Sequence, residues 1–173
     1  MRIKLGHYYI NQRTEFSRFY LEDENGEKIK TKEAEEFIEN YTNQNENPDN
    51  YFRIEDSRLH WMINKETEYI FVAPKIKEIE PYAFRDNNYL KFAFLGNNVE
   101  TIFAFAFSGC TKLKEVILPR SISEIQQYAF SDCEEMETIY YEGTKKEWER
   151  IKKDRYWKFG NSATIITLDG IVN

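Results

Sequence analysis

The sequence has little of the chemistry on which enzyme and metal sites depend. Its 173 residues include two cysteines and two histidines. Cys110 and Cys133 have no second cysteine pair that would complete the spacing of a zinc site, and His7 and His60 have no carboxylate motif nearby. A glycine-rich phosphate loop, a G-x-S-x-G elbow and an H-E-x-x-H motif are also missing. We therefore expect no catalytic residue, no metal and no cofactor, and predict that the protein is not an enzyme.

Long apolar runs are absent as well. No run approaches the roughly 18 residues of a membrane-spanning helix. The start of the chain, Met1 to His7, lacks the apolar stretch and the small-residue cleavage site of a signal peptide. These absences predict a cytoplasmic protein with no membrane segment. In such a reducing compartment, the two cysteines are expected to be buried thiols rather than a disulfide.

Positive charge is in the minority, and its distribution is uneven. The net charge is −6; residues 1–50 carry 7 basic and 11 acidic side chains, residues 76–144 carry 6 and 11, and the tail from residue 145 carries 7 and 4. An acidic scaffold repels phosphates, which argues against direct nucleic-acid binding. The acidic surface serves either ordinary solubility or contact with the basic groove of a nucleic-acid-handling protein.

What the sequence does contain is a repeat. Between Ile76 and Thr144, three units of 23 residues follow one another, and apolar residues recur at fixed offsets in each unit. The recurring positions are Ile76, Val99 and Ile122; Ile79, Ile102 and Ile125; Ala83-Phe84, Ala106-Phe107 and Ala129-Phe130; Leu90, Leu113 and Met136; Ala93, Val116 and Ile139; and Leu95, Leu118 and Tyr141. Such a period is the signature of a solenoid, in which each unit buries its apolar side against its neighbours.

The end of each unit predicts a strand. Apolar residues two apart, as at Val116 and Leu118, indicate an extended segment with one buried face, and Pro119 ends it. Stacked units would align these strands as a short parallel sheet with a spacing of about 4.8 Å. The Ala-Phe step predicts a helical or tight turn on the opposite, convex side, with the two cysteines stacked in the interior above Asn87.

The units read I-x-x-I-x-x-x-A-F-x-x-C-x-x-L-x-x-V-x-L-P, and residues 99–119 follow this pattern almost throughout. The pattern resembles the BspA-type (Treponema-type) leucine-rich repeat of bacterial surface and interaction proteins. The third unit has Tyr141-Glu-Gly in place of Leu-Pro, and the first has Asn87 in place of the cysteine. The likeness covers about residues 51–170. It implies a scaffold for protein interaction rather than a catalyst.

The resemblance also suggests how the chain is organised. The predicted segments are an entry hairpin and first strand at 51–75, repeats at 76–98, 99–121 and 122–144, and a C-terminal cap at 145–173. Residues 1–50 match no family; they contain strand-like segments at 3–10 and 16–21, an acidic helix from an N-capping Thr31 to Tyr41, and a linker at 43–50. This small α+β element either docks on the first repeat as a cap or binds a separate partner.

The residues that alternate with the buried strand positions form the candidate binding site. They are Phe92, Phe94, Glu115, Ile117, Thr138 and Tyr140. Four of the six are aromatic or branched apolar, and aromatic anchors are where interface energy concentrates. This stripe either binds a different protein or is covered by the N-terminal element or by a second copy of the chain.

The tail from Lys145 to Trp157 has helical spacing and a basic outer face. Trp148 and Ile151 are placed to cover the last repeat, which predicts a capping helix, with residues 163–168 as the closing strand. The alternative for its basic residues is contact with an acidic partner or with nucleic acid.

Together these patterns predict an α/β repeat solenoid: a short leucine-rich repeat stack with parallel strands, an N-terminal α+β appendage and a helical C-terminal cap. The expected function is non-catalytic binding of a protein partner through the strand face. The alternative is an intracellular inhibitor from a phage or mobile element, similar to an anti-CRISPR protein, that blocks a nucleic-acid-handling effector with its acidic surface. A homo-oligomer is compatible with either function.

Overall fold

The computed structural model describes residues 2–5, 8–12, 19–22, 52–62, 66, 68–72 and 75–172. Within residues 2–22, the description is of the backbone alone. The helix expected between Thr31 and Tyr41 and the linker expected at 43–50 lie outside the described residues.

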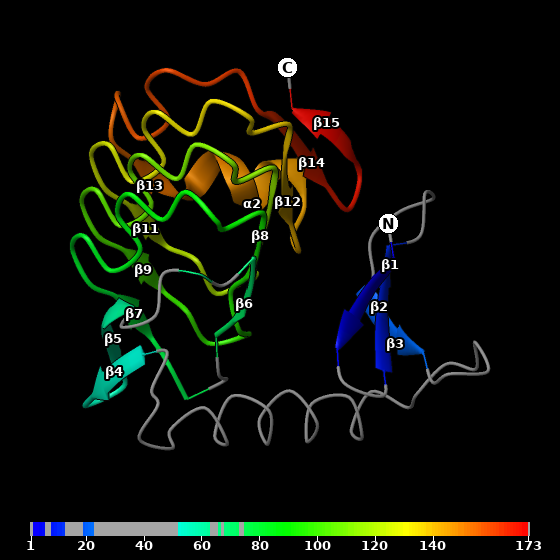
Figure 1. The fold of residues 1–173 in the computed structure, drawn as a ribbon. Helices are drawn as coiled ribbons and strands as arrows, with labels where there is room; N and C mark the ends of the chain where they lie inside the picture. Colours follow the sequence, from blue (N-terminus) through cyan, green and yellow to red (C-terminus); the bar gives the residue numbers. More distant parts are fainter. Residues whose placement is uncertain are drawn as a thin grey trace.

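From residue 52 onward the chain winds as a solenoid, and its turns supply the strands of two six-stranded sheets (Figure 1). The first sheet contains β6 (Tyr69–Phe71), β8 (Phe92–Phe94), β10 (Glu115–Leu118), β12 (Thr138–Tyr141), β14 (Thr164–Thr167) and β15 (Gly170–Val172). The second contains β4 (Phe52–Glu55), β5 (Arg58–Met62), β7 (Glu78–Ile79), β9 (Thr101–Ile102), β11 (Glu124–Ile125) and β13 (Lys152–Lys153). Pairing is parallel except at the two ends, where β4 runs antiparallel to β5 and β15 runs antiparallel to β14.

The register of the first sheet follows the sequence repeat. Each residue of β8 lies beside the residue 23 positions later in β10, and each residue of β10 beside its counterpart in β12. The predicted parallel sheet is therefore confirmed. The antiparallel pair β4–β5 lies within the segment that was expected to hold an entry hairpin.

The core lies between the two sheets. Every recurring position of the three units is buried, and all of them belong to one hydrophobic cluster. Full burial of a Leu, Ile or Phe side chain contributes about 1.5–3 kcal/mol, so the regular columns account for much of the stability of the solenoid. Each unit buries its apolar side only by stacking on its neighbours.

A stack of phenylalanine rings runs through this core. The ring centroids of Phe84 and Phe107 are 4.6 Å apart, and those of Phe107 and Phe130 are 5.0 Å apart, with interplanar angles of 15° and 8°. Alanine precedes each phenylalanine in the sequence and is also buried. The small alanine side chain lets adjacent turns approach closely while the ring fills the interior.

The cysteines occupy a second internal column. The thiol of Cys110 donates to the carbonyl oxygen of Phe84 at 3.1 Å, and the thiol of Cys133 donates to that of Phe107 at 3.2 Å. In the next turn, the side-chain amide of Asn161 donates to the carbonyl of Phe130 at 2.7 Å. Both cysteines are buried thiols, as predicted, and burial raises the pKa of the Cys133 thiol.

The tail forms a further turn of the solenoid in place of a long capping helix. The helix α2 spans Lys145–Arg150, six residues, and buries Trp148. The chain then adds β13 to the second sheet and β14 to the first. The segment from Lys152 therefore extends both sheets, and β15 closes the edge of the first one.

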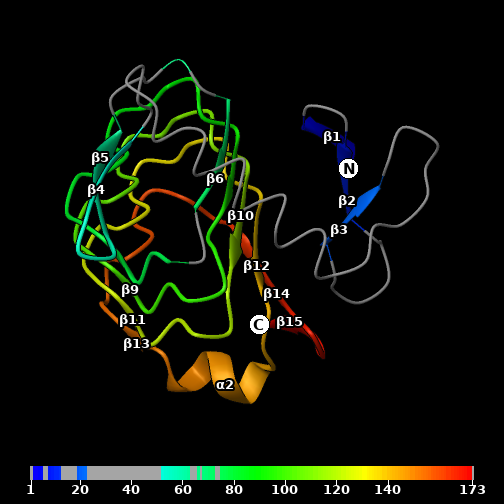
Figure 2. The ribbon, with the colours of Figure 1, turned by 90° about the horizontal axis from the view of Figure 1, so that it is seen from below.

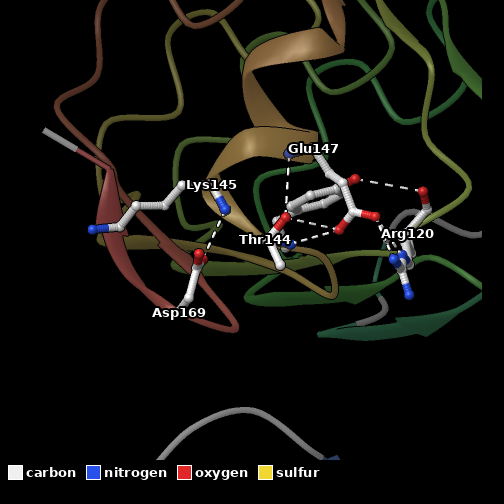
Figure 3. A network of polar contacts seen from close by, with 6 residues as sticks. Arg120, Thr144, Lys145, Glu147 and Asp169 are labelled. Atoms are coloured by element: carbon white, nitrogen blue, oxygen red, sulfur yellow. Dashed lines mark hydrogen bonds and ion pairs between the residues drawn. The ribbon is translucent and has the colours of Figure 1, made fainter.

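Polar contacts fasten α2 to the preceding turn (Figure 3). Thr144 and Glu147 form a capping box, in which the Thr144 amide donates to Glu147 Oε2 at 2.8 Å. Arg120 donates to Glu147 Oε1 through Nε at 2.9 Å and also pairs with it through Nη2. The backbone amide of Lys145 donates to Asp169 Oδ1 at 2.8 Å. The Thr144 amide, together with Arg120, lowers the pKa of Glu147 to about 2.

The predicted α/β class needs correction, because the solenoid is almost entirely β. Among the described residues, helix is confined to α2. The Ala-Phe steps lie in turns, as expected, and the I-x-x-I segments before them, for which the sequence pattern gave no structure, supply the two-residue strands β7, β9 and β11 of the second sheet. These strands are too short to show a period of two in the sequence.

A separate three-stranded sheet forms near the start of the chain. It consists of β1 (Arg2–Leu5), β2 (Tyr8–Gln12) and β3 (Phe19–Glu22), paired antiparallel in that order. Within the part of the chain that the structure describes, no helix has the length and apolar character needed to cross a lipid bilayer.

Candidate functional site

The six residues predicted to bind a partner lie together on one face of the first sheet. In-register pairing puts Phe92, Glu115 and Thr138 in one row, and Phe94, Ile117 and Tyr140 in the adjacent row. The same parallel pairing extends both rows to β6 at one edge of the sheet and to β14, which is next to the edge strand β15, on the other side. We call this surface the outer face; it comprises Tyr69, Phe71, Phe92, Phe94, Glu115, Ile117, Thr138, Tyr140, Thr164 and Ile166.

Sequence reasoning missed two apolar members of the outer face. Phe71 is one repeat length before Phe94, but it lies in the segment that was assigned to an entry hairpin. Ile166 pairs with Tyr140, although the residues of α2 separate the two by more than one repeat length. A search for period-two alternation on either side of the three clear repeats would have found both residues.

The outer face has two parts that differ in exposure. The first, which we call the covered patch, comprises Phe71, Phe92, Phe94 and Ile117, with exposed fractions of 2%, 1%, 9% and 0%. The second, which we call the open patch, comprises Tyr140 and Ile166, and both are half-buried. Among the described residues, the four members of the covered patch are the only buried apolar side chains outside the core cluster. The covered patch is thus a second apolar surface, separated from the core by the sheet.

Glu115 is the one charged residue of the outer face. Its Oε2 atom is buried and has no hydrogen-bond partner. Burial raises the pKa of this carboxyl group. A carboxylate of this kind favours a cationic or hydrogen-bond-donating group above the face.

A stack of exposed and half-buried aromatic rings follows the turns between the two sheets, and the sequence pattern did not reveal it. The rings of Tyr82, Phe105, Tyr128 and Tyr156 are spaced 5.4, 5.1 and 5.8 Å apart and lie nearly parallel. The first three residues have φ values of 64°, 58° and 56°, which bulky residues rarely adopt. Their amides donate to carbonyls of the following turn, and these bonds help to hold the left-handed backbone in place.

The stack leaves few ring faces free. Each ring covers its neighbours, and the guanidinium groups of Arg85 and Arg155 lie 5.5 and 5.3 Å from the centroids of the terminal rings, Tyr82 and Tyr156. A planar ligand would therefore meet mainly ring edges. Packing between neighbouring turns explains the stack of aromatic rings, whereas packing in the core does not explain why the covered patch is buried.

Concave polar surface occurs at the rim of the first sheet. A depression of about 500 Å³ is lined by Lys114, Glu134, Glu135, Met136, Glu137, Ser162 and Thr164. It is open to solvent, and Lys114 pairs with Glu135 and Glu137 at 3.5 and 3.8 Å. Within the described ranges, no three His, Cys, Asp or Glu side chains gather in a way that could hold a metal ion. The depression has neither the enclosure nor the apolar lining of a typical small-molecule site.

Several solved structures of bacterial proteins match part of the chain, each with a TM-score below 0.5. A leucine-rich cell surface protein of Faecalibacterium prausnitzii is 29% identical with a TM-score of 0.46, and the match covers 47% of this chain and 22% of that one. The leucine-rich repeat protein of T. pallidum is 23% identical with a TM-score of 0.47, covering 54% and 51%. The pneumococcal vaccine antigen PcpA is 23% identical with a TM-score of 0.45, covering 53% and 29%. The matched region is thus about half or less of each of these proteins.

A search of curated protein sequences found no match. The family model for the BspA type leucine rich repeat region matches residues 33–162 in six copies. This match spans most of the chain and includes all three repeats found in the sequence. The chain belongs to the BspA-type leucine-rich repeat family.

Proposed function

We propose that the chain is a non-catalytic interaction module that binds a protein partner through the outer face. The observation that carries this proposal is the row of apolar side chains on the face of the sheet opposite the core, which continues past the covered patch to the half-buried Tyr140 and Ile166. Aromatic and branched side chains stand there in two rows on a hydrogen-bonded sheet. Rows fixed in this way lose little conformational freedom on binding, which favours affinity.

The open patch, together with Tyr69 and Thr164, belongs to the part of the outer face that keeps solvent exposure. Tyr140 and Ile166 are adjacent on β12 and β14 and half-buried. A tyrosine can bury its ring while its hydroxyl group remains hydrogen-bonded, and tyrosine is enriched at energetic centres of interfaces. We expect these two residues to anchor the contact, with Thr138 and Thr164 beside them.

The inhibitor alternative depends on a concentrated acidic surface. On the solenoid, acidic side chains pair with basic ones of an adjacent turn: Glu68 with Lys91 at 2.7 Å, Glu78 with Arg58 at 2.7 Å, and Glu124 with Lys152 at 2.9 Å. Pairing of this kind weakens a field of one sign. We therefore favour an apolar contact over an electrostatic one.

Affinity capture from the source cells tests the proposal. The bait is the full chain, compared with the double variant Tyr140→Ser/Ile166→Ser. The matched control is Tyr82→Ser/Tyr89→Ser, which removes two exposed aromatic side chains from turns outside the outer face. Quantitative mass spectrometry then compares the proteins retained by the three baits.

The proposal predicts that at least one protein is depleted on the outer-face variant and retained by the control. Its binding should also persist in high salt, because apolar contacts are not screened. Retention by the outer-face variant together with loss from the control would move the binding site to the turns. Steep loss of capture with salt would favour an electrostatic contact instead.

A further inference from the structure

The difference in exposure between the two patches requires a cover over β6, β8 and β10. Ile117 lies between Phe94 and Tyr140 in its row, and Tyr140 lies between Ile117 and Ile166 in the same row. Both residues therefore have large apolar neighbours on either side within the sheet. Yet Ile117 is 0% exposed, whereas Tyr140 is half-buried. Position within the sheet alone does not produce this contrast.

The β1–β2–β3 sheet has a matching apolar face. Antiparallel pairing sets Ile3 opposite Ile10 and Ile10 opposite Leu21, and paired residues share a face. Two-residue periodicity adds Leu5, Tyr8, Gln12 and Phe19 to that face and leaves Arg2, Lys4, Tyr9, Asn11, Tyr20 and Glu22 on the other. A sheet with one apolar face gains stability by burying that face against another element.

The two surfaces also agree in place and size. Figures 1 and 2 both draw β1, β2 and β3 on the side of the first sheet that points away from the core. The small sheet has three strands, and the covered patch extends over three strands, β6, β8 and β10. Face-to-face packing of two sheets at a separation of about 10 Å would bury both apolar faces.

We propose that the β1–β2–β3 sheet packs its apolar face on the covered patch of the same chain, so that a partner meets the open patch and must displace the small sheet to reach the rest. The displacement of the small sheet by a partner rests on the proposed function, whereas the contact between the two sheets does not. The small sheet would then limit how much of the outer face a partner can use.

Photo-cross-linking of the purified full chain tests the contact. p-Benzoylphenylalanine is placed at Phe94, where one aromatic side chain replaces another, and the cross-linked residues are identified by mass spectrometry. The matched control places the same group at Tyr82, on the turns. The expected product is a monomer in which position 94 is joined to a residue between 2 and 22, with a yield that does not change on dilution. The control should lack this product.

A second variant tests the apolar nature of the contact. Ile117→Asp, combined with the photoreactive group at position 94, should lose the product while the circular dichroism of the solenoid is retained. A cross-linked dimer would show that a second copy is the cover, and the absence of any product between position 94 and residues 2–22 would also overturn the proposal. The measurement uses no partner, so its result is separate from affinity capture: an internal cross-link without a captured partner would leave the contact standing and reject the proposed function.

Discussion

Replacing Phe107 by alanine should be among the most damaging single changes to the solenoid. The ring is fully buried and stacks on Phe84 at 4.6 Å and on Phe130 at 5.0 Å. Truncation of a buried Phe to Ala costs about 3–5 kcal/mol. The two stacked pairs that are lost contribute about 0.5–1.5 kcal/mol each beyond area burial, which puts Phe107→Ala at the upper end, about 4–5 kcal/mol. Because each turn is stabilised by its neighbours, the cavity weakens two interfaces at once.

Urea unfolding followed by circular dichroism measures this loss. The matched control is Tyr82→Ala, in which a ring that is 51% exposed stacks on one neighbour at 5.4 Å; we expect the control to cost about 1 kcal/mol or less. The two variants thus compare the internal and external aromatic stacks of the same turns. A loss below about 2 kcal/mol for Phe107→Ala, or a loss equal to that of the control, would refute the assignment of stability to the internal stack.

Three further predictions concern titratable groups. The pKa of Glu147 is lowered to about 2 in the folded protein, so the ionised carboxylate stabilises the fold at pH values above the ordinary pKa of a glutamate, and this stabilisation is lost as the pH falls. Glu147→Gln should therefore have a lower melting temperature than wild type at neutral pH, and the difference between the two melting temperatures should narrow in acid. The pKa of Glu115 is raised, mainly by burial, so its ionisation opposes folding at high pH; Glu115→Gln should raise the melting temperature at neutral pH but not below pH about 4. For either variant, a difference in melting temperature from wild type that stays the same at all pH values would contradict the predicted role of that carboxyl group. Cys110 and Cys133 are buried, so a thiol reagent should leave both unmodified in native protein and label both in urea; labelling of the native state would contradict the internal column.

The repeated part of the fold could be predicted because its packing is local. Ile79, Ile102 and Ile125 recur at one offset because each contacts its counterpart one turn away, so the spacing of the turns is encoded in the sequence. The outer face followed from the same regularity, since a strand residue beside a buried one must lie on the opposite face. The pairing of Phe94 with Ile117 and of Ile117 with Tyr140 matches that reasoning.

The remaining features depend on contacts that leave no periodic signal. The second sheet uses two-residue strands, which alternate too briefly to be recognised. The tail departs from the 23-residue period because α2 intervenes before β13, so its helical spacing suggested a cap where the chain makes another turn. Burial of Phe92 and Ile117 depends on a cover from outside the sheet, which the spacing of strand residues does not reveal. The left-handed backbone at Tyr82 requires the carbonyl of the following turn.

Thiol footprinting at Tyr140 tests whether a protein partner binds the outer face. Both native cysteines are buried, so Tyr140→Cys introduces a single reactive thiol on the open patch, and Tyr82→Cys does so on the turns. Labelling rates are compared with and without the partner obtained by affinity capture. We expect the partner to slow labelling at position 140 and to leave the labelling rate at position 82 unchanged. An unchanged rate at position 140 with a slowed rate at position 82 would contradict binding through the outer face.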